Sequence, residues 1–257
     1  TSVSILVNGD GFEDAVERWR GLDKTEISLG IHINLSEGKP VSRDLRILTA
    51  QDGFFRGKQA THALLKEPSG IELEREIQKE INAQIQILKK FKIPITHLDG
   101  HQHIHIAPVV LPIALSEATK NKIQWIRIPD EPHPSIITLM AQPDSQGEAT
   151  MFSRLGMAAR SFVMLSEVES CDHFRGLYSK GKLDISLLDE LFKNLPMGLT
   201  EMMVHPGRVA DSENTGVFST FSTQEREKEL TALLDPAFPS LLQKYGISLT
   251  PFPENLP

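Results

Sequence analysis

Sulfur and long apolar runs are scarce in this sequence. Cys171 is its single cysteine, so an intrachain disulfide and a cysteine-rich metal site are both excluded. No run of about 18 or more apolar residues is present, and we therefore expect no membrane-spanning helix. Thr1–Ser4 has neither the basic nor the apolar region of a secretory signal. Together with the lone cysteine, this predicts a cytoplasmic protein.

An excess of positive charge and the common nucleotide-binding motifs are also lacking. The chain has 27 Lys and Arg against 34 Asp and Glu, a formal charge of −7. That balance gives a polyanion such as nucleic acid no electrostatic attraction. Neither a G-x-G-x-x-G run after the first apolar segment nor a P-loop is present, which disfavours a nucleotide-binding fold.

In other respects the amino-acid composition is that of an average globular protein. Hydrophobic residues make up 40% and charged residues 24% of the 257 residues. This length predicts one large domain or two small ones, and because no convincing domain boundary is visible we expect a single domain over residues 1–257.

Short apolar runs alternate with helical patterns along the chain. The clearest helix covers Ile71–Phe91, where apolar residues recur every three or four positions. Strands that alternate with helices predict an α/β fold with a parallel sheet, either a (β/α) barrel or a doubly wound sheet. The expected strands are Val3–Val7, Ile27–Leu35, Ile93–Leu98, Ile123–Ile128, Glu201–His205 and Ile247–Thr250. The other expected helices are Ile185–Leu195, Ser222–Leu234 and one that ends at Tyr245–Gly246.

Four of the nine histidines lie in the run Thr96–His105. The residues before it predict a strand, and Gly100 lets the chain turn just after that strand. The histidines therefore fall at the carboxyl end of a strand, where the active sites of parallel α/β folds lie. Since histidine and aspartate are common metal ligands, this run predicts a metal or catalytic site. An extended chain from His97 to His105 is too long for all four rings to reach one ion.

Three further strands carry polar side chains near their ends. Alternation places His32 and Asn34 on one side of an apolar strand, where buried polar groups need polar partners. His205 ends another apolar strand just before a Pro-Gly turn, and Arg127 lies near the end of a fourth. We expect these side chains to meet the histidine-rich run at one edge of the sheet.

These segments together resemble the YdjC-like carbohydrate deacetylases, a family that includes chitooligosaccharide deacetylases. The matching segments are Thr1–Gly9, Gly30–Val41, Thr96–His105, Arg127–Pro129 and His205–Gly207. The resemblance implies a distorted TIM-like (β/α) barrel with parallel strands. It also implies a hydrolase that removes the acetyl group from an N-acetylated sugar or oligosaccharide.

The resemblance implies a divalent cation held by one Asp and two His. Carried over by motif, the two histidines are His32 and His101. The family is commonly described with Mg²⁺, which is therefore the first expectation. Histidine and carboxylate ligands also suit Zn²⁺ or another transition metal.

The catalytic and substrate-binding residues are also expected near this metal. The resemblance implies His205 as the general acid for the leaving amine and Asp99 as the second catalytic residue beside the metal. Arg127, His103 and His105 are the expected substrate-binding residues.

One segment of the family is not found in this sequence. The family opens with a strand that ends in N-A-D-D-F-G, whose aspartates supply the third metal ligand and the general base. Thr1–Gly9 instead matches the family's second strand, so Asp10 is a poor match for that ligand. We therefore expect that the first βα unit is missing from the given chain.

Two other functions stay open on the sequence alone. One is another metal-dependent barrel hydrolase or isomerase that acts on sugars or phosphoesters. A two-metal phosphoesterase needs several carboxylates, whereas Asp99 is the only acid in the runs Gly30–Leu35, Thr96–His105 and Met202–Gly207. The other is a catalytically inactive sugar-binding homologue.

The expected partners follow from the proposed chemistry and the composition. We expect an N-acetylated sugar as substrate and neither nucleic acid nor a membrane. A homodimer is expected because closed symmetric dimers are the commonest assemblies. Trp125, Phe54 and Phe55 have rings that can stack on a sugar, but with only 6% aromatics core packing is their expected use.

Overall fold

The computed structural model describes residues 1–22, 26–68, 70–132, 146–209 and 216–252. The chain divides into two compact units. The first contains residues 1–128, 158–170 and 250–257, and the second contains residues 129–157 and 171–249. The single domain over residues 1–257 stays a prediction.

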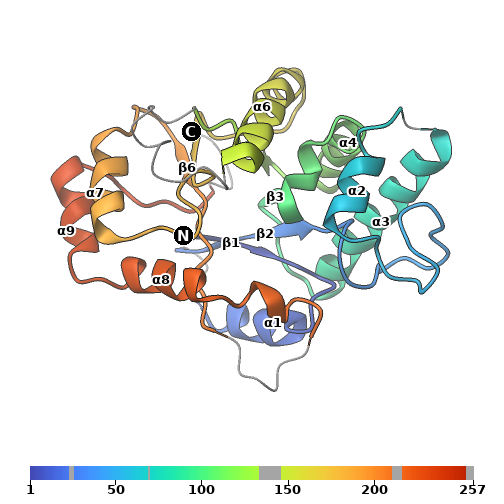
Figure 1. The fold of residues 1–257 in the computed structure, drawn as a ribbon, viewed down its shortest axis with the longest axis horizontal. Helices are drawn as coiled ribbons and strands as arrows, with labels where there is room; N and C mark the ends of the chain where they lie inside the picture. The colour runs from blue at the N-terminus through green and yellow to red at the C-terminus, as the bar shows by residue number, and fades with distance from the viewer. Residues whose placement is uncertain (23–25, 69, 133–145, 210–215, 253–257) are drawn as a thin grey trace. The chain divides into compact units, whose positions relative to one another are not determined.

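The first unit is built on a four-stranded parallel sheet in the order β1-β2-β3-β4, of which Figure 1 labels β1, β2 and β3. Its strands are β1 (Ser2–Ile5), β2 (Ser28–Ile33), β3 (His97–Gly100) and β4 (Trp125–Ile126). Its helical segments are α1 (Phe12–Arg20), α2 (Lys58–Leu64), α3 (Ile71–Lys90), the 3₁₀ segment η1 (His101–Ile106) and α4 (Leu111–Asn121). Because parallel strands need crossover connections, each strand is joined to the next by a segment that contains a helix.

Helix α3 forms because its apolar residues lie on one stripe. Leu73, Ile77, Ile81, Ile85 and Leu88 are all buried. Glu72 and Glu74 lie in its first turn and Lys89 and Lys90 in its last, which suits the helix dipole at both ends. The helix packs against β2 and α4 (Figure 1).

The strand register gives the sheet an apolar face. Ile31 on β2 lies beside Ile5 on β1 and Leu98 on β3, and all three side chains are buried. Since side chains alternate along a strand, the residues between them point to the opposite face. There, His32 lies beside Asp99, and Ser4 lies beside Gly30.

This second face, which we call the polar face, is lined with groups that form hydrogen bonds to one another. Its residues are Ser4, Gly30, His32, His97, Asp99 and Arg127. Burial of polar groups on a parallel sheet is costly unless they are paired. The pairing within the polar face therefore offsets the cost of burying these groups.

An ion pair closes the polar face. Nη1 of Arg127 lies 2.6 Å from Oδ2 of Asp99, and the two side chains are 13% and 1% exposed. Burial alone raises the pKa of the Asp99 carboxyl, but Arg127 and His32 lower it further than burial raises it. The net pKa of Asp99 lies well below its usual range, so the carboxylate is ionised at neutral pH.

The second unit contains a two-stranded parallel sheet of β5 (His173–Arg175) and β6 (Thr200–Met202). Its helical segments are α6 (Gln146–Val163, of which residues 158–163 belong to the first unit), α7 (Ile185–Lys193), the 3₁₀ segment η2 (Ser219–Phe221), α8 (Gln224–Leu233) and α9 (Phe238–Tyr245). One core cluster consists of Ala149, Phe152, Phe174, Leu177 and Met203. The other consists of Leu183, Leu188, Phe192 and Ala232.

The predicted α/β class with parallel strands is confirmed, since every strand pair that joins two named strands of the described residues is parallel. Trp125 and Phe55 are buried, as expected for core packing, whereas Phe54 is half-buried under the ammonium of Lys39. Within the described ranges, none of the helices has both the length and the apolar character needed to cross a membrane. The missing first βα unit stays a prediction.

The expected strand Ile247–Thr250 is wrong. Gly246 adopts a left-handed conformation (φ 63°) that ends α9, and the N–H of Ile247 donates to the carbonyl of Leu242. Pro251 follows directly and has no N–H to donate to a sheet. Strand β5, in contrast, has no counterpart among the expected strands because its three residues are too few to show a period.

Replacing Gly30 by Ala should destabilise the first unit. An added Cβ at this position would lie 2.4 Å from Nε2 and Cδ2 of the buried His97 ring. Such overpacking costs about 1–3 kcal/mol. We expect the free energy of unfolding to fall by this amount in urea titrations. Gly11→Ala is the control, since nothing lies within 4 Å of its added Cβ; an equal effect of the two changes would contradict the steric explanation.

Replacing Arg127 by Met should destabilise the protein near neutral pH because it leaves the Asp99 carboxylate buried without its cation. We expect a loss of about 3–5 kcal/mol in the free energy of unfolding. The double change Arg127→Met with Asp99→Asn should recover part of this loss.

The ion pair also predicts the direction of the pH dependence. A carboxyl whose pKa is lowered by folding stabilises the protein above its unfolded-state pKa of about 3.9. This stabilisation should be lost as the pH falls from that value toward the lower folded-state pKa. Unfolding curves recorded from neutral to acid pH should show a smaller acid-side loss in the double variant than in the wild type. Equal curves would contradict a lowered pKa of Asp99.

Candidate functional site

His32 is held by the ionised Asp99 on the polar face. Nδ1 of His32 lies 2.7 Å from Oδ1 of Asp99. Because an ionised carboxylate only accepts hydrogen bonds, Nδ1 carries the proton and donates it. In the tautomer with its proton on Nδ1, the lone pair is on Nε2, for which the described residues provide no hydrogen-bond partner. A carboxylate behind one nitrogen is the usual support of a histidine that binds a metal through the other.

His101 has a similar arrangement on the neighbouring segment η1. Its Nε2 lies 2.8 Å from Oε2 of Glu37, and the two side chains are 12% and 23% exposed. The rings of His32 and His101 pack edge to face, with their centroids 5.6 Å apart. The structure therefore brings together the two histidines that the sequence predicts as metal ligands, each with a carboxylate partner. Their role as ligands stays a prediction.

A chain of hydrogen bonds continues from Asp99 into the buried part of the polar face. The hydroxyl of Ser4 donates to Oδ2 of Asp99 over 2.9 Å, and Nε2 of His97 lies 3.1 Å from the same hydroxyl oxygen. Since Ser4 has one proton to donate, Nε2 of His97 must carry its own proton and donate to Ser4. Burial lowers the pKa of His97 to about 4, so its ring is neutral. His97 therefore supports Asp99 as a neutral donor.

The two remaining histidines of the run are buried beneath the site. His105 is fully buried, its Nε2 lies 2.9 Å from the carbonyl oxygen of Arg127, and burial lowers its pKa to about 4. Burial also holds the pKa of His103 well below its usual range. Substrate binding by His103, His105 and Arg127 stays a prediction, and the burial of His105 favours a role in positioning Arg127.

The backbone of η1 is strained just after His101. Gln102 (φ 53°, ψ 33°) and His103 (φ 54°, ψ 27°) are two consecutive residues in the left-handed region. This region costs a non-glycine residue about 1–2 kcal/mol. Such strain persists only where the surrounding contacts enforce it, and it clusters at functional sites. Here the two strained residues directly follow His101, which is a predicted metal ligand.

His205 belongs to the second unit. It lies just after β6, and its backbone N–H donates to the buried carboxylate of Glu229. The same carboxylate accepts the N–H of Gly181 over 2.7 Å. The backbone at His205 is thus anchored by a carboxylate from α8. Its role as the general acid stays a prediction.

Two residues of the site were missed in the sequence. Ser4 has a signal, because Ser2 and Ser4 alternate with Val3 and Ile5 along β1 and so point to the face of His32. Glu37 lies in the segment Gly30–Val41 that resembles the family, but local periodicity does not reveal its contact with a side chain 64 positions away.

The donors present fit a divalent cation as part of a ligand set. His32 and His101 each have one nitrogen held by a carboxylate, which sets the other as the lone-pair nitrogen that metals require. In the described part of the chain, no three His, Cys, Asp or Glu side chains converge on one point. The described residues thus bring together two candidate ligands, His32 and His101, and the rest of the ligand set stays a prediction.

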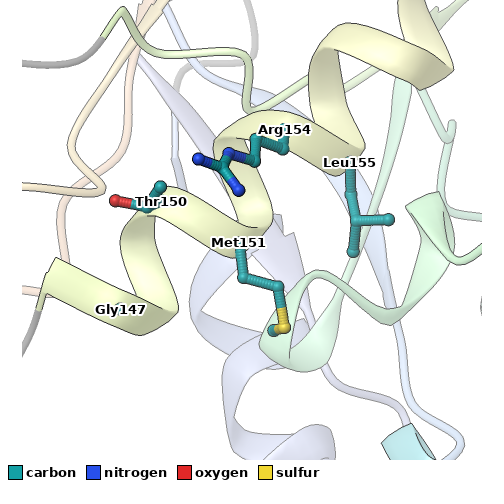
Figure 2. A pocket seen from close by; sticks show the side chains of 5 residues that line it. All are labelled: Gly147, Thr150, Met151, Arg154 and Leu155. Atoms are coloured by element: carbon teal, nitrogen blue, oxygen red, sulfur yellow. The ribbon is translucent and has the colours of Figure 1, made fainter.

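A surface pocket lies elsewhere, on helix α6. Gly147, Thr150, Met151, Arg154 and Leu155 line it, and all five come from one helix (Figure 2). None of its lining residues belongs to the polar face.

Comparisons with known proteins agree with the fold. A solved structure from Enterococcus faecalis, described as a candidate for cellobiose-phosphate cleavage, matches with a TM-score of 0.70 at 19% identity. The match covers 98% of this chain and 86% of that one. At this identity, the similarity shows the fold alone.

Comparisons of sequence identify the family. The chain is 29% identical to a mouse protein named carbohydrate deacetylase, over 97% of this chain and 84% of that protein. It is 29% identical to a human protein of the same name, over 97% and 80%, and 37% identical to one from Brevibacillus brevis, over 48% and 46%. The family model described as YdjC-like protein matches residues 1–244. Because this match covers nearly the whole chain, the protein belongs to the YdjC-like family.

Proposed function

We propose that this protein is a carbohydrate deacetylase, a hydrolase that removes the acetyl group from an N-acetylated sugar. Relatives named carbohydrate deacetylase align over nearly all of the chain. The observation that carries the proposal is the pair His32 and His101, whose rings lie together with a carboxylate behind each. The finer proposal is a substrate similar to chitooligosaccharides.

The same pair supports a proposed metal site. His32 and His101 would hold a divalent cation, which when bound activates water and polarises the amide carbonyl. Mg²⁺ is the ion that the family resemblance implies, and nitrogen ligands make Zn²⁺ or another transition metal the alternative.

The residues around the pair would fix its geometry. Asp99 holds the proton of His32 on Nδ1, so that Nε2 keeps its lone pair. Arg127 keeps Asp99 ionised, and Ser4 supplies a further donor to the same carboxylate. Water is largely excluded from this carboxylate because Asp99 is buried. In surroundings with so little water, the hydrogen bond from His32 to Asp99 is stronger than it would be in water.

Hydrolysis of an amide also needs a proton for the departing nitrogen. We propose His205 as its donor, because imidazole is the side chain whose charge changes near neutral pH and it commonly acts as a general acid. Glu229 fixes the backbone of His205 through its N–H. A fixed backbone limits the positions that the ring can take.

Three single variants separate the metal ligands from the acid. His32→Ala and His101→Ala should lose the bound metal, because each removes a ligand. His205→Ala should keep its metal and lower turnover by about 10²–10⁴-fold, since it removes only the acid. The measurements are metal content by mass spectrometry and acetate release from an N-acetylated glucosamine oligomer.

His173→Ala is the matched control, since this histidine lies on β5 and contacts a backbone carbonyl of the loop before β6. It should keep both metal and turnover. If His205→Ala loses metal as readily as the other two variants, His205 is a ligand. If the wild type releases no acetate from any N-acetylated sugar in the presence of Mg²⁺ or Zn²⁺, the proposed function is wrong.

A further inference from the structure

We infer that Glu37 is a positioning residue that fixes the ring orientation and the tautomer of His101. This inference rests on the proposed function, in which His101 binds a metal. It assigns a specific atom, since a proton held on Nε2 by Glu37 leaves the lone pair of the neutral ring on Nδ1. His32 is held through the opposite nitrogen, Nδ1. The two ligands would therefore present different ring nitrogens.

The side chains of Glu37 and His101 are in direct contact. Oε2 of Glu37 lies 2.8 Å from Nε2 of His101, and both groups are largely shielded from water. A carboxylate accepts this hydrogen bond, so the nitrogen must donate. Hydrogen bonds with a charged partner are about twice as strong as neutral ones, which is enough to select one tautomer.

The backbone of Glu37 is fixed at both of its polar atoms. Its N–H donates to Oδ1 of Asn34, and its carbonyl accepts from Nδ2 of Asn34 over 2.6 Å. Nδ2 of Asn8 donates to the same carbonyl over 3.2 Å and to the carbonyl of Lys39 over 2.9 Å. A loop residue held in this way presents its carboxylate at a defined place.

Asn34, which holds the backbone of Glu37, is itself hydrogen-bonded to helix α3. Gln84 on α3 accepts the N–H of Asn34 over 3.0 Å and donates to its carbonyl over 2.6 Å. Gln84 and Asn34 are both fully buried. The position of Glu37 is thus set by the longest helix of the first unit through a polar contact that an apolar residue could not replace.

The residues next to Glu37 and His101 in the chain are also in contact with each other. Ser36, the neighbour of Glu37, donates its hydroxyl to Oε1 of Gln102, the neighbour of His101. The loop after β2 and the segment η1 are therefore joined by two contacts, one between Glu37 and His101 and one between Ser36 and Gln102. Since Gln102 is one of the two left-handed residues of η1, these contacts also help to hold the strained turn that places His101.

A direct role of Glu37 in binding metal or substrate is the competing explanation. The variants Glu37→Gln and Glu37→Ala separate the two. An amide oxygen can still accept from Nε2, so Glu37→Gln should keep the tautomer, whereas Glu37→Ala removes the acceptor. Glu72→Gln is the matched control, because Glu72 is exposed and pairs only with Arg75 among the described residues.

The first readout is the tautomer of His101 in the metal-free full chain, measured by nitrogen-15 NMR of labelled histidine. Wild type and Glu37→Gln should show the proton on Nε2, and Glu37→Ala should show a mixture of tautomers. The second readout is the affinity for Zn²⁺ alone, measured by titration calorimetry. Loss of such a support typically weakens metal binding by about 10–100-fold, which we expect for Glu37→Ala. Glu37→Gln should lose much less, and acetate release should show a lower kcat with little change in KM.

Two results would overturn the inference. One is a Glu37→Ala variant that keeps both the Nε2 proton and the wild-type affinity for Zn²⁺. The other is a Glu37→Gln variant that loses as much Zn²⁺ affinity as Glu37→Ala while its tautomer is unchanged, because the charge would then act directly on the metal. If the wild type releases no acetate, the proposed function fails, but the tautomer and Zn²⁺ measurements still decide the role of Glu37.

Discussion

A carboxylate removed from water is the constraint around which the first unit is arranged. An unpaired ion in such a place would cost several kcal/mol, so Asp99 requires donors on each of its oxygens. Arg127 and Ser4 serve one oxygen and His32 the other. These donors come from three different strands or their ends. The same contacts that make the burial of Asp99 tolerable also orient the histidine, so stability and the proposed chemistry depend on one set of bonds.

Helix α3 shows how the interior of this unit can be apolar and still control a polar loop. One stripe of the helix is buried and apolar, but Glu76, Glu80 and Gln84 follow at intervals of four residues along another. Glu76 accepts the N–H groups of Arg46, Ile47 and Leu48, and Glu80 accepts those of Val41 and Ser42. The loop after β2 is therefore bound to the helix along much of its length. A loop that is held in this way presents its side chains at defined positions.

The sequence predicts the parts of this molecule that depend on local periodicity. The apolar stripe of α3 and the alternation around His32 are both local signals, and the structure confirms the helix to within one residue of its expected end. The contacts of Glu37 with His101 and of His32 with Asp99 depend on strand register and loop path, which join residues more than 60 positions apart. The prediction of a strand at Ile247–Thr250 is wrong for a related reason. An apolar run becomes a strand only where a neighbouring strand accepts its hydrogen bonds, whereas the N–H of Ile247 donates to the carbonyl of Leu242 at the end of α9.

The close approach of Gly30 to His97 has a consequence for how this family can vary. An imidazole fills the space that a Cβ at position 30 would need, and that imidazole donates to the hydroxyl that supports Asp99. A larger residue at position 30 is therefore compatible only with a smaller one at position 97, and the smaller one must come with another donor for Ser4 or another partner for Asp99. Substitutions at these sites are coupled through three strands. In related chains, positions 4, 30, 97 and 99 should accordingly change as a group and not one at a time.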